Sequence, residues 1–500
     1  MVLVLVCSLL AGCGNNTSDG DANTLVWMFT GSPKDDTTRV LEMVTAKLKE
    51  KTGATVEFKF VDTSNYDLVL SSGEKVDLIA APDYLNYWAN CEKAAFAEIT
   101  DDDLKQFAPY VWENGQDYLA ASKYDGVRYG IPGMNKTYTD MCYAARGDLM
   151  DKYGIEDLNS IENVEKYLDA VAKNEPNVIP FDMTGGQFYW LINLFAHDWG
   201  WATPGSMNYA STIYYNINDP EKKPFIATEQ PEMKEFTTRM KKWKDNGYFS
   251  KSVLSNKTAV TESFINGRSA LAITSGGLVN CNNIYRGVVE KGHEDWNIRF
   301  YSATQKMQRQ YNSMNNNISI SYACKNKELA LKVINTVYED QEIYRLMRYG
   351  IEGEHYTVDA DGNYEIILVN GVQKYYSCTG GIFNDAHEYK TKLIFPGSEE
   401  LAAKLESTHI NDPFINCVVS DPSLREIEVA ITEITQTMTQ SRCYGFADDI
   451  DKSLADETAA LKEAGVEKIM EVWNAKMSKF AEENRGLIEI SNEENAAKLQ

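Results

Sequence analysis

Residues 127–155, VRYGIPGMNKTYTDMCYAARGDLMDKYGI, are the stretch around which we interpret the fold. A turn at Asp125-Gly126 leads into extended, β-branched and aromatic sequence, which Gly130-Ile131-Pro132-Gly133 interrupts. Helical character follows from Arg146 and stops at Gly154. A change from strand to helix across Gly and Pro residues is typical of a connection between structural units. We therefore predict that this stretch carries the chain out of one α/β lobe and into a second.

The sequence before this stretch alternates between strand and helix patterns. Residues 24–30 (TLVWMFT) and 76–80 (VDLIA) are apolar runs, and residues 55–61 alternate apolar with polar side chains. Between them, Ser32 as N-cap and Pro33 as the first helical residue predict a helix that begins there. This order is typical of a parallel sheet covered by helices, whose ligands lie beyond the carboxyl ends of the strands. Those ends are residues 29–32 and 81–88.

The same alternation returns after residue 155. Two units of helix, strand and Gly-Gly turn are predicted, the first over residues 161–187 and the second over residues 230–277. Strands at 296–302 and 317–323, separated by a polar loop, provide a second crossing back to the first lobe. We therefore expect the two lobes to be interleaved along the chain.

The remaining chain gives a division into domains. A hairpin is predicted within residues 359–371, and two helical stripes of apolar residues near the C-terminus indicate core packing. We predict a signal peptide (1–12), a tether (13–23), lobe 1 (24–135 and 318–350), lobe 2 (136–317 and 400–485) and a hairpin-containing insertion (351–399).

The N-terminus resembles a bacterial lipoprotein signal. An apolar run over residues 1–10, too short to span a bilayer, ends in Leu10-Ala11-Gly12-Cys13. This pattern predicts cleavage before Cys13 and attachment of lipid to its sulfur. A buried N-terminal strand, or a secretory peptide that carries no lipid, are the alternatives. No Lys or Arg precedes the run, which leaves open a start upstream of Met1.

Charge and cysteine content limit the class of partner and of site. The net charge of −24 argues against nucleic acid and anionic membrane surfaces, and it suits a neutral or cationic ligand. With 43% hydrophobic and 24% charged residues the chain has enough apolar side chains for sizeable cores. Seven cysteines follow Cys13, without C-x-x-C spacing, so neither a zinc site nor a disulfide framework is indicated, although one pair could form.

The search for catalytic motifs is negative. The sequence contains no phosphate-binding G-x-x-x-x-G-K-[ST], no G-x-S-x-G and no H-E-x-x-H, and its five histidines lack metal-ligand spacing. A carboxylate pair for glycoside hydrolysis cannot be recognised from sequence and stays open. We expect no catalytic residues, no cofactor and no metal.

Aromatic residues are concentrated beside the predicted strand ends and Gly turns. Sugar rings pack on aromatic rings, and their hydroxyls need amides and carboxylates as partners. Gly-Gly turns that open helices can offer N–H groups to ligand oxygens. For each aromatic residue the alternative is a place in the core between helix and sheet. The predicted ligand-binding residues are Asp83, Tyr84, Trp88, Asn135, Asp140, Gly186, Gln187, Trp190, Trp199, Ser275 and Gly276.

Four stretches together resemble extracellular solute-binding proteins of family 1, the sugar-binding subunits of ABC importers. They are SSGEKVDLIAAPDYLNYW, YGIPGMNKTYTDMCYAARGDLMDKYGI, FINGRSALAITSGG and SYACKNKELALKVINTVYEDQEIYRLMRYGIEGEHYTV. The last one and the C-terminal helices are most similar to a Firmicutes lipoprotein subgroup with a DUF3502-type C-terminal region. The resemblance implies an α/β two-lobe periplasmic-binding-protein-like fold (type II), here with a helical C-terminal region. It also implies ligand contacts from residues 81–88 and from the loop after the second-lobe Gly turn.

Three functions follow from these observations. The first is a monomeric, lipid-anchored receptor on the extracellular face of a Gram-positive-type cell membrane, which delivers an oligosaccharide to ABC permease subunits. The second is a surface enzyme acting on glycosides, and the third is a sensor or structural lipoprotein that presents its ligand state to a partner. The missing catalytic motifs and the paired α/β lobes favour the first.

Overall fold

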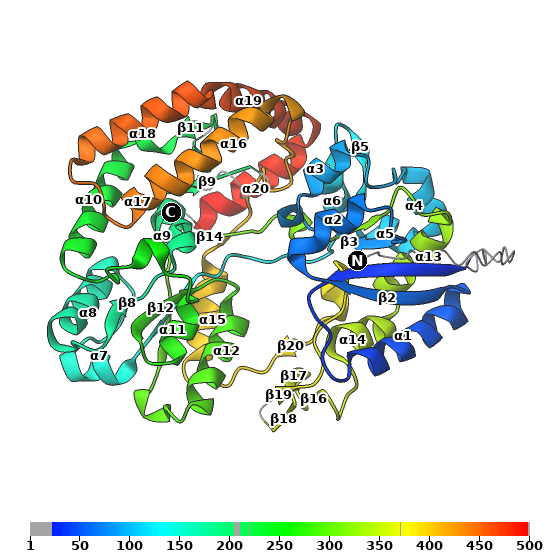
Figure 1. Ribbon diagram of the computed structural model, residues 1–500, viewed down its shortest axis with the longest axis horizontal. Helices are drawn as coiled ribbons and strands as arrows, with labels where there is room; N and C mark the ends of the chain where they lie inside the picture. The colour runs from blue at the N-terminus through cyan, green and yellow to red at the C-terminus, as the bar shows by residue number, and fades with distance from the viewer. Residues whose placement is uncertain (1–22, 205–210, 220, 371, 499–500) are drawn as a thin grey trace, which may run out of the picture.

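Two β-sheets, one in each lobe, organise the computed structural model, which describes residues 23–204, 211–219, 221–370 and 372–498 (Figure 1). The sheet of lobe 1 has the order β2-β1-β3-β15-β6. β1 pairs in parallel with β2 and β3, whereas β15 runs antiparallel to both β3 and β6. The strands are β1 (Thr24–Thr30), β2 (Thr55–Val61), β3 (Leu78–Ala80), β6 (Gly130–Pro132) and β15 (Asn317–Ile320).

Helices cover both faces of the lobe 1 sheet. One face packs Trp27 and Ile318 against α1 and α13, and the other packs Met28 and Tyr87 into a smaller core. The helices of this lobe are α1 (Thr37–Thr52), α2 (Tyr66–Ser71), α3 (Tyr87–Glu92), α4 (Asp101–Phe107), α5 (Pro109–Asn114), α6 (Gln116–Leu119), α13 (Lys327–Glu339) and α14 (Gln341–Tyr349).

The predicted start of the first helix at Ser32 and Pro33 is wrong. α1 begins at Thr37, with Asp36 in the N-cap position. The amide of Asp36 donates to the carbonyl oxygen of Lys374 at 3.1 Å, and its carboxylate lies 3.2 Å from His355 Nε2. A contact with a distant segment therefore overrides the local capping signal.

The stretch 127–155 crosses between the lobes, as predicted, but it contains three short strands and not one. β5 (Val127–Arg128) forms a hairpin with β4 (Lys123–Tyr124), and β6 then joins the lobe 1 sheet. After the crossing, β7 (Cys142–Ala145) enters the lobe 2 sheet and α7 (Gly147–Tyr153) follows. α7 ends at Tyr153, and Gly154 follows it in a left-handed conformation, which explains the glycine at the predicted stop.

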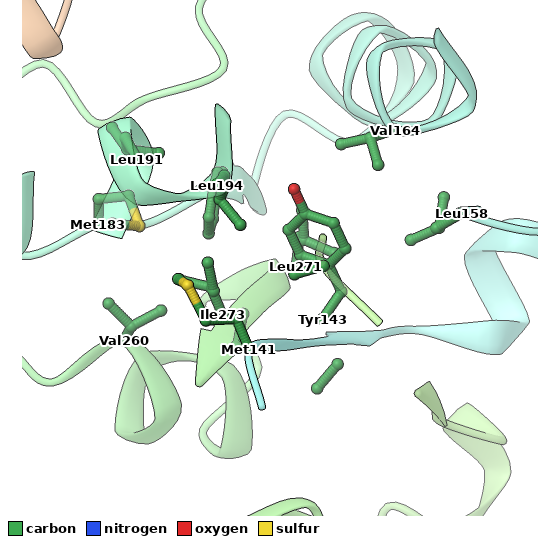
Figure 2. Packing of buried hydrophobic residues seen from close by; sticks show 14 of the residues in the cluster. Met141, Tyr143, Leu158, Val164, Met183, Leu191, Leu194, Val260, Leu271 and Ile273 are labelled. Carbon is green, nitrogen blue, oxygen red and sulfur yellow. The ribbon is translucent and has the colours of Figure 1, made fainter. Parts of the chain in front are cut away.

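The sheet of lobe 2 has the order β13-β7-β12-β8. β12 (Ser269–Thr274) pairs in parallel with β8 (Ile179–Phe181) and antiparallel with β7, and β13 (Arg299–Ser302) forms the other edge. Figure 2 shows Tyr143, Leu271 and Ile273 of this sheet packed against Leu191 and Leu194. The helices of this lobe are α7, α8 (Ile161–Asn174), α9 (Phe188–Asp198), α10 (Pro231–Asp245), α11 (Val260–Ile265), α12 (Gly277–Glu290) and α15 (Ser398–Ser407).

Two further segments join the lobes. The chain returns through β14 (Gln308–Arg309) to β15, where the predicted strand 317–323 ends early, at Ile320. It leaves lobe 1 again after β20 (Lys390–Thr391) and reaches α15. Asn282 of α12 holds this third segment, since its side chain donates to Lys392 O at 2.7 Å and accepts from Ile394 N at 2.9 Å. The lobes are thus connected three times.

The segment between α14 and α15 contains small antiparallel pairs. β16 (Tyr356–Val358) pairs with β17 (Asn363–Ile366), which confirms a hairpin around Gly362, and β18 (Leu368–Val369) pairs with β19 (Val372–Gln373). Further along, Tyr375, Cys378 and Ile382 are buried in the core of lobe 1. The segment therefore both projects from lobe 1 and contributes to its interior.

The C-terminal helices form a third core on lobe 2, at the upper left of Figure 1. They pack on the small sheet of β9 (Trp201–Ala202), β10 (Ile213–Asn216) and β11 (Phe225–Ile226), and β21 (His409–Ile410) pairs with β14. Both predicted stripes face this core, with Leu424, Ile431, Val466 and Trp473 buried. The helices are α16 (Arg425–Ile434), α17 (Gln440–Cys443), α18 (Ile450–Ala464), α19 (Val466–Glu483) and α20 (Arg485–Lys498).

The structure bears on the predicted N-terminal signal, on membrane-spanning helices and on the cysteines. The signal peptide, Cys13 and almost all of the tether lie outside the described residues. Among the helices that the structure describes, none has the length and apolar content needed to cross a membrane. All seven cysteines after Cys13 are free thiols, and six of them are buried.

Candidate functional site

A cavity of about 560 Å³ lies between residues 83–93 of lobe 1 and residues 417–432 of the C-terminal region. We call it the interlobe cavity. Its volume is within the range of small-molecule sites. Tyr84 from lobe 1 is 65% exposed and Val429 from the other wall is 67% exposed, so each wall offers an uncovered apolar side chain. Such surfaces suit the C–H faces of a sugar ring.

The lobe 1 wall is built by the chain reversal after β3. β3 ends at Ala80, a 3-10 turn η2 covers Asp83–Leu85, and Asn86 adopts φ 58° before α3 begins. The Asn86 side chain donates to Asp67 Oδ2 at 2.7 Å, which holds this left-handed residue in place. The reversal brings the predicted residues Asp83, Tyr84 and Trp88 to one cavity.

Asp83 is the most strongly perturbed carboxyl group of this wall. Burial raises its pKa to about 6, and N–H groups of Asp83 and Tyr84 oppose the shift without cancelling it. At neutral pH the group is therefore a desolvated carboxylate, which is a strong hydrogen-bond acceptor for a ligand hydroxyl. Trp88 contributes an indole whose Nε1 is buried and has no hydrogen-bond partner in the described structure.

The opposite wall is one face of α16 and the turn before it. Asp421 caps the 3-10 turn η11 (Pro422–Leu424) by accepting from the Ser423 amide at 3.1 Å. Arg425, Glu428, Val429 and Thr432 follow at spacings of three, one and three residues, which places them on a single helix face. This face turns toward lobe 1, while Leu424 and Ile431 turn into the C-terminal core.

An ion pair joins the two walls. Arg425 Nη2 of α16 donates to Glu92 Oε2 of α3, and both residues line the interlobe cavity. The other carboxylate oxygen of Glu92 accepts from the Tyr124 hydroxyl at 3.0 Å. The lobes therefore touch across the cavity through charged side chains.

A second group of predicted residues lies at the carboxyl ends of β8 and β12, which are neighbours in the lobe 2 sheet. Gly186 and Gln187 follow β8 in the 3-10 turn η4 (Gly185–Gln187), and Ser275 and Gly276 follow β12. Gly186 is exposed with open space around its α-carbon, and Gln187 Oε1 is buried without a partner in the described structure. We call this group the β8/β12 edge.

Asp140 from the first crossing lies against this edge. The amides of Gly276 and Gly277 donate to the carbonyl oxygens of Thr139 and Asp140 at 3.0 and 3.1 Å. A Cβ at Gly277 would come within 2.9 Å of the Asp140 Cβ, so glycine is required for this approach. The Gly276 N–H is thus used within the protein, which argues against its predicted availability to a ligand.

The Asp140 carboxylate also has a partner. His409 Nε2 lies 2.7 Å from Asp140 Oδ1, and the His409 ring stacks on Tyr138 with a centroid separation of 3.8 Å. The Tyr138 hydroxyl donates to Asn411 at 3.1 Å. These contacts fasten the first crossing to β21 and support a role for Asp140 in holding the crossing.

The other predicted residues lie apart from the interlobe cavity. Asn135 is buried in the first crossing, where its Oδ1 is 3.5 Å from Asn316 Nδ2. Trp190 is half-buried against the lobe 2 core. Trp199 lines a separate cavity of about 360 Å³, between α8, α9 and α10.

The sequence did not point to the wall formed by residues 417–432 or to Tyr311. Burial raises the pKa of Tyr311, and the nearby Ser275 hydroxyl opposes that shift, so Tyr311 belongs to the β8/β12 edge. Tyr311 follows β14 in the second crossing, where its amide donates to the Thr137 carbonyl oxygen at 2.8 Å, and no motif in the sequence marks it. The polar face of α16 gave no signal either, because its spacing is that of any solvated helix surface.

Known proteins similar to this chain are solute-binding proteins. Residues 43–350, more than half of the chain, match the family model of bacterial extracellular solute-binding proteins. A carbohydrate ABC transporter substrate-binding protein of Streptococcus pneumoniae serotype 4 is 23% identical over 370 residues, which make up 71% of each chain.

Solved structures share the two-lobe fold at low identity. The N-glycan transport solute binding protein NgtS of Streptococcus pneumoniae superposes with a TM-score of 0.73 at 19% identity, covering 92% of this chain and 99% of that one. NgtS has also been solved with Man1GlcNAc and Man5GlcNAc. FusA of S. pneumoniae in complex with kestose gives a TM-score of 0.65 at 15% identity, covering 92% of this chain and all of the other. The predicted α/β two-lobe fold is confirmed.

Proposed function

The chain belongs to the bacterial extracellular solute-binding proteins, and on this premise we propose that it captures an oligosaccharide between its lobes for an ABC importer. The observation that carries the proposal is the interlobe cavity, whose walls come from both lobes and expose Tyr84 and Val429 to each other's side. The family is one of solute-binding proteins, which agrees with the expectation of a binding protein and not an enzyme.

The mechanism is a shift between open and closed arrangements of the lobes. A ligand that touches residues 83–93 and residues 417–432 at once makes its full set of contacts only when the lobes are close. Binding therefore stabilises the closed arrangement by the difference in affinity for the two states. Asp83 accepts hydroxyl hydrogens, and Tyr84 and Val429 pack against ring faces.

We propose that the β8/β12 edge adds to the binding surface. We place Gln187, Ser275 and Tyr311 among the groups that contact the ligand, because Gln187 Oε1 is unsatisfied and Tyr311 lies beside Ser275. Asp140 acts through the crossing that it fastens.

Anchoring and partners follow the family resemblance. Acylation of Cys13 ties the protein to the outer face of the membrane, and the mature monomer docks on two permease subunits. The C-terminal helices over residues 425–498 belong to the DUF3502-type region of a Firmicutes subgroup.

A thermal-shift screen followed by calorimetry tests the proposal. A ligand that binds only the folded protein raises its melting temperature. We expect at least one of Man1GlcNAc, Man5GlcNAc and kestose to do so, and Asp83→Ala to abolish the effect. Asp102→Asn, which changes a carboxylate that is 94% exposed, is the matched control and should bind normally. If no saccharide changes the melting temperature, or if Asp83→Ala binds as well as the wild type, the proposal is wrong.

A further inference from the structure

One ion pair spans the interlobe cavity, and its position bears on the length of the ligand. Arg425 projects from α16 and Glu92 from the last turn of α3, and each residue also lines the cavity. A contact between two facing walls closes the space between them. An extended saccharide lying between the walls therefore cannot occupy the point where these two side chains meet while the pair is formed.

Glu92 is held in place on the lobe 1 side. Its side chain is 19% exposed, and its Oε1 accepts from the Tyr124 hydroxyl at 3.0 Å. Burial, together with the hydrogen bond to Glu92, raises the pKa of Tyr124, so the phenol stays protonated and remains the donor. Glu92 thus presents its second oxygen, Oε2, to Arg425 in a fixed direction.

Arg425 is the movable partner. Its side chain is 50% exposed, and ion pairs with this much solvent access are weak. Arg425 is also the first residue of α16, where the helix dipole disfavours a positive charge. Helix stability therefore does not account for an arginine at this position, whereas the contact with Glu92 does.

We propose that the Glu92–Arg425 pair ends the interlobe cavity and limits the length of the saccharide that it accepts. This inference rests on the proposed function. With the pair formed, the last sugar of a short chain meets a carboxylate that accepts from its hydroxyls and a guanidinium that donates to them. A longer chain fits only after the Arg425 side chain has moved away from Glu92. Its binding free energy is therefore less favourable by the free energy of the broken ion pair.

Binding of a short and a long saccharide tests the proposal. Calorimetry with Man1GlcNAc and Man5GlcNAc gives the ratio of the two affinities for each variant. In Arg425→Gln the ratio should shift toward Man5GlcNAc by about three- to tenfold relative to the wild type. Arg425→Lys, which keeps the charge, should retain most of the wild-type ratio. Lys452→Gln breaks an exposed ion pair with Asp456 away from the cavity and should change nothing. Equal ratios in the wild type and Arg425→Gln would overturn the proposal.

A second measurement needs no ligand, so it tests the ion-pair barrier separately from the proposed saccharide binding. Spin labels at Leu68→Cys on α2 and Lys468→Cys on α19, with Cys324→Ser to remove the least buried thiol, report the distance between the two lobes. Arg425→Gln should broaden this distance distribution toward larger values, and Lys452→Gln should not. If no saccharide binds the wild type, the proposed function fails, and an unchanged distance in Arg425→Gln then rejects the ion-pair barrier independently.

Discussion

Asn317 makes two hydrogen bonds to the backbone of Ala81. The Asn317 Nδ2 donates to the Ala81 carbonyl oxygen at 2.8 Å, and the Ala81 amide donates to the Asn317 carbonyl oxygen at 2.8 Å. Asn317 begins β15 on the second crossing, and Ala81 is the residue that follows β3. The crossing therefore positions the reversal that carries Asp83 and Tyr84 into the interlobe cavity.

Replacement of Asn317 with Ala should destabilise the protein and loosen this reversal. The change leaves the buried carbonyl of Ala81 without its side-chain donor, which costs about 1–3 kcal/mol in the free energy of unfolding. Urea titration measures the loss, and hydrogen exchange should show faster exchange at residues 81–86. Asn174→Ala, at an exposed hydrogen bond of α8, is the control. Equal stability of the two variants would contradict the assignment.

Asp83→Asn should stabilise the folded protein in a pH-dependent way. The folded-state pKa of Asp83 is about 6 and lies above its ordinary value of 3.8, so the folded state binds more protons between these values. Stability therefore falls as the pH rises through this window and stays low above it. Since Asn carries no charge, the variant should exceed the wild type by at most about 3 kcal/mol near pH 7 and nearly match it near pH 4.

The measurement for Asp83→Asn is the melting temperature across that pH range, together with saccharide affinity. Affinity should fall even though stability rises, because the substitution exchanges a charged acceptor for a neutral one. A stabilisation that is the same at both pH values would show that the Asp83 charge is not the cause.

Two aromatic residues that the sequence treated alike should behave differently. Tyr84→Ala removes an exposed ring from the interlobe cavity and should weaken saccharide binding by about tenfold, as expected for the loss of one stacking contact. Trp199→Ala changes a residue of the separate cavity beside α8 and α10, so the dissociation constant should stay within about twofold. Calorimetry distinguishes the two variants. If Trp199→Ala has the larger effect, the ligand lies elsewhere.

Substitutions of Asp140 and His409 should have the same effect on saccharide binding, and the effects should not add. His409→Phe keeps a ring to stack on Tyr138 and removes the 2.7 Å contact with Asp140. If Asp140 fastens the crossing, Asp140→Ala and His409→Phe should weaken saccharide binding equally, and the double variant should be no worse than either. Should Asp140 contact the ligand directly, the effects of the two changes would add.

The buried pair of Arg442 and Glu457 should be essential for the C-terminal core. Its atoms lie 2.7 and 3.1 Å apart, and the side chains are 0% and 1% exposed. Arg442→Met leaves Glu457 buried and unpaired, at a cost of about 3–5 kcal/mol in unfolding free energy. Adding Glu457→Gln should recover most of the loss. In the exposed pair of Lys452 and Asp456, Lys452→Met should cost less than about 1 kcal/mol. Urea titration of all three variants tests this, and a cost below about 1 kcal/mol for Arg442→Met would contradict it.

Local patterns predicted much of the fold, and contacts between distant segments explain where they failed. Side-chain periodicity and turn residues, which are local features of the sequence, predicted three parts of the fold. These are the crossing at 127–155, the Gly turns after β8 and β12, and the apolar stripes of the C-terminal helices. The start of α1 depends instead on Lys374 and His355, which are far away in the sequence. No capping rule applied to Ser32 and Pro33 could reveal that contact.

The candidate site was predictable on one side only. The residues after β3 follow from the rule that ligands lie beyond parallel strands, and Asp83, Tyr84 and Trp88 line the cavity. The facing wall comes from α16, whose polar face has the spacing of any solvated helix surface. Only the packing of α16 on lobe 2 shows that this face meets lobe 1.

Closure of the lobes on a saccharide is the central claim, and small-angle X-ray scattering tests it most directly. The mature protein is measured alone and at saturating concentration of the saccharide that raises its melting temperature. We predict that the radius of gyration decreases on binding and that Asp83→Ala shows no decrease under the same conditions. An unchanged radius of gyration for the saturated wild-type protein would contradict closure on ligand.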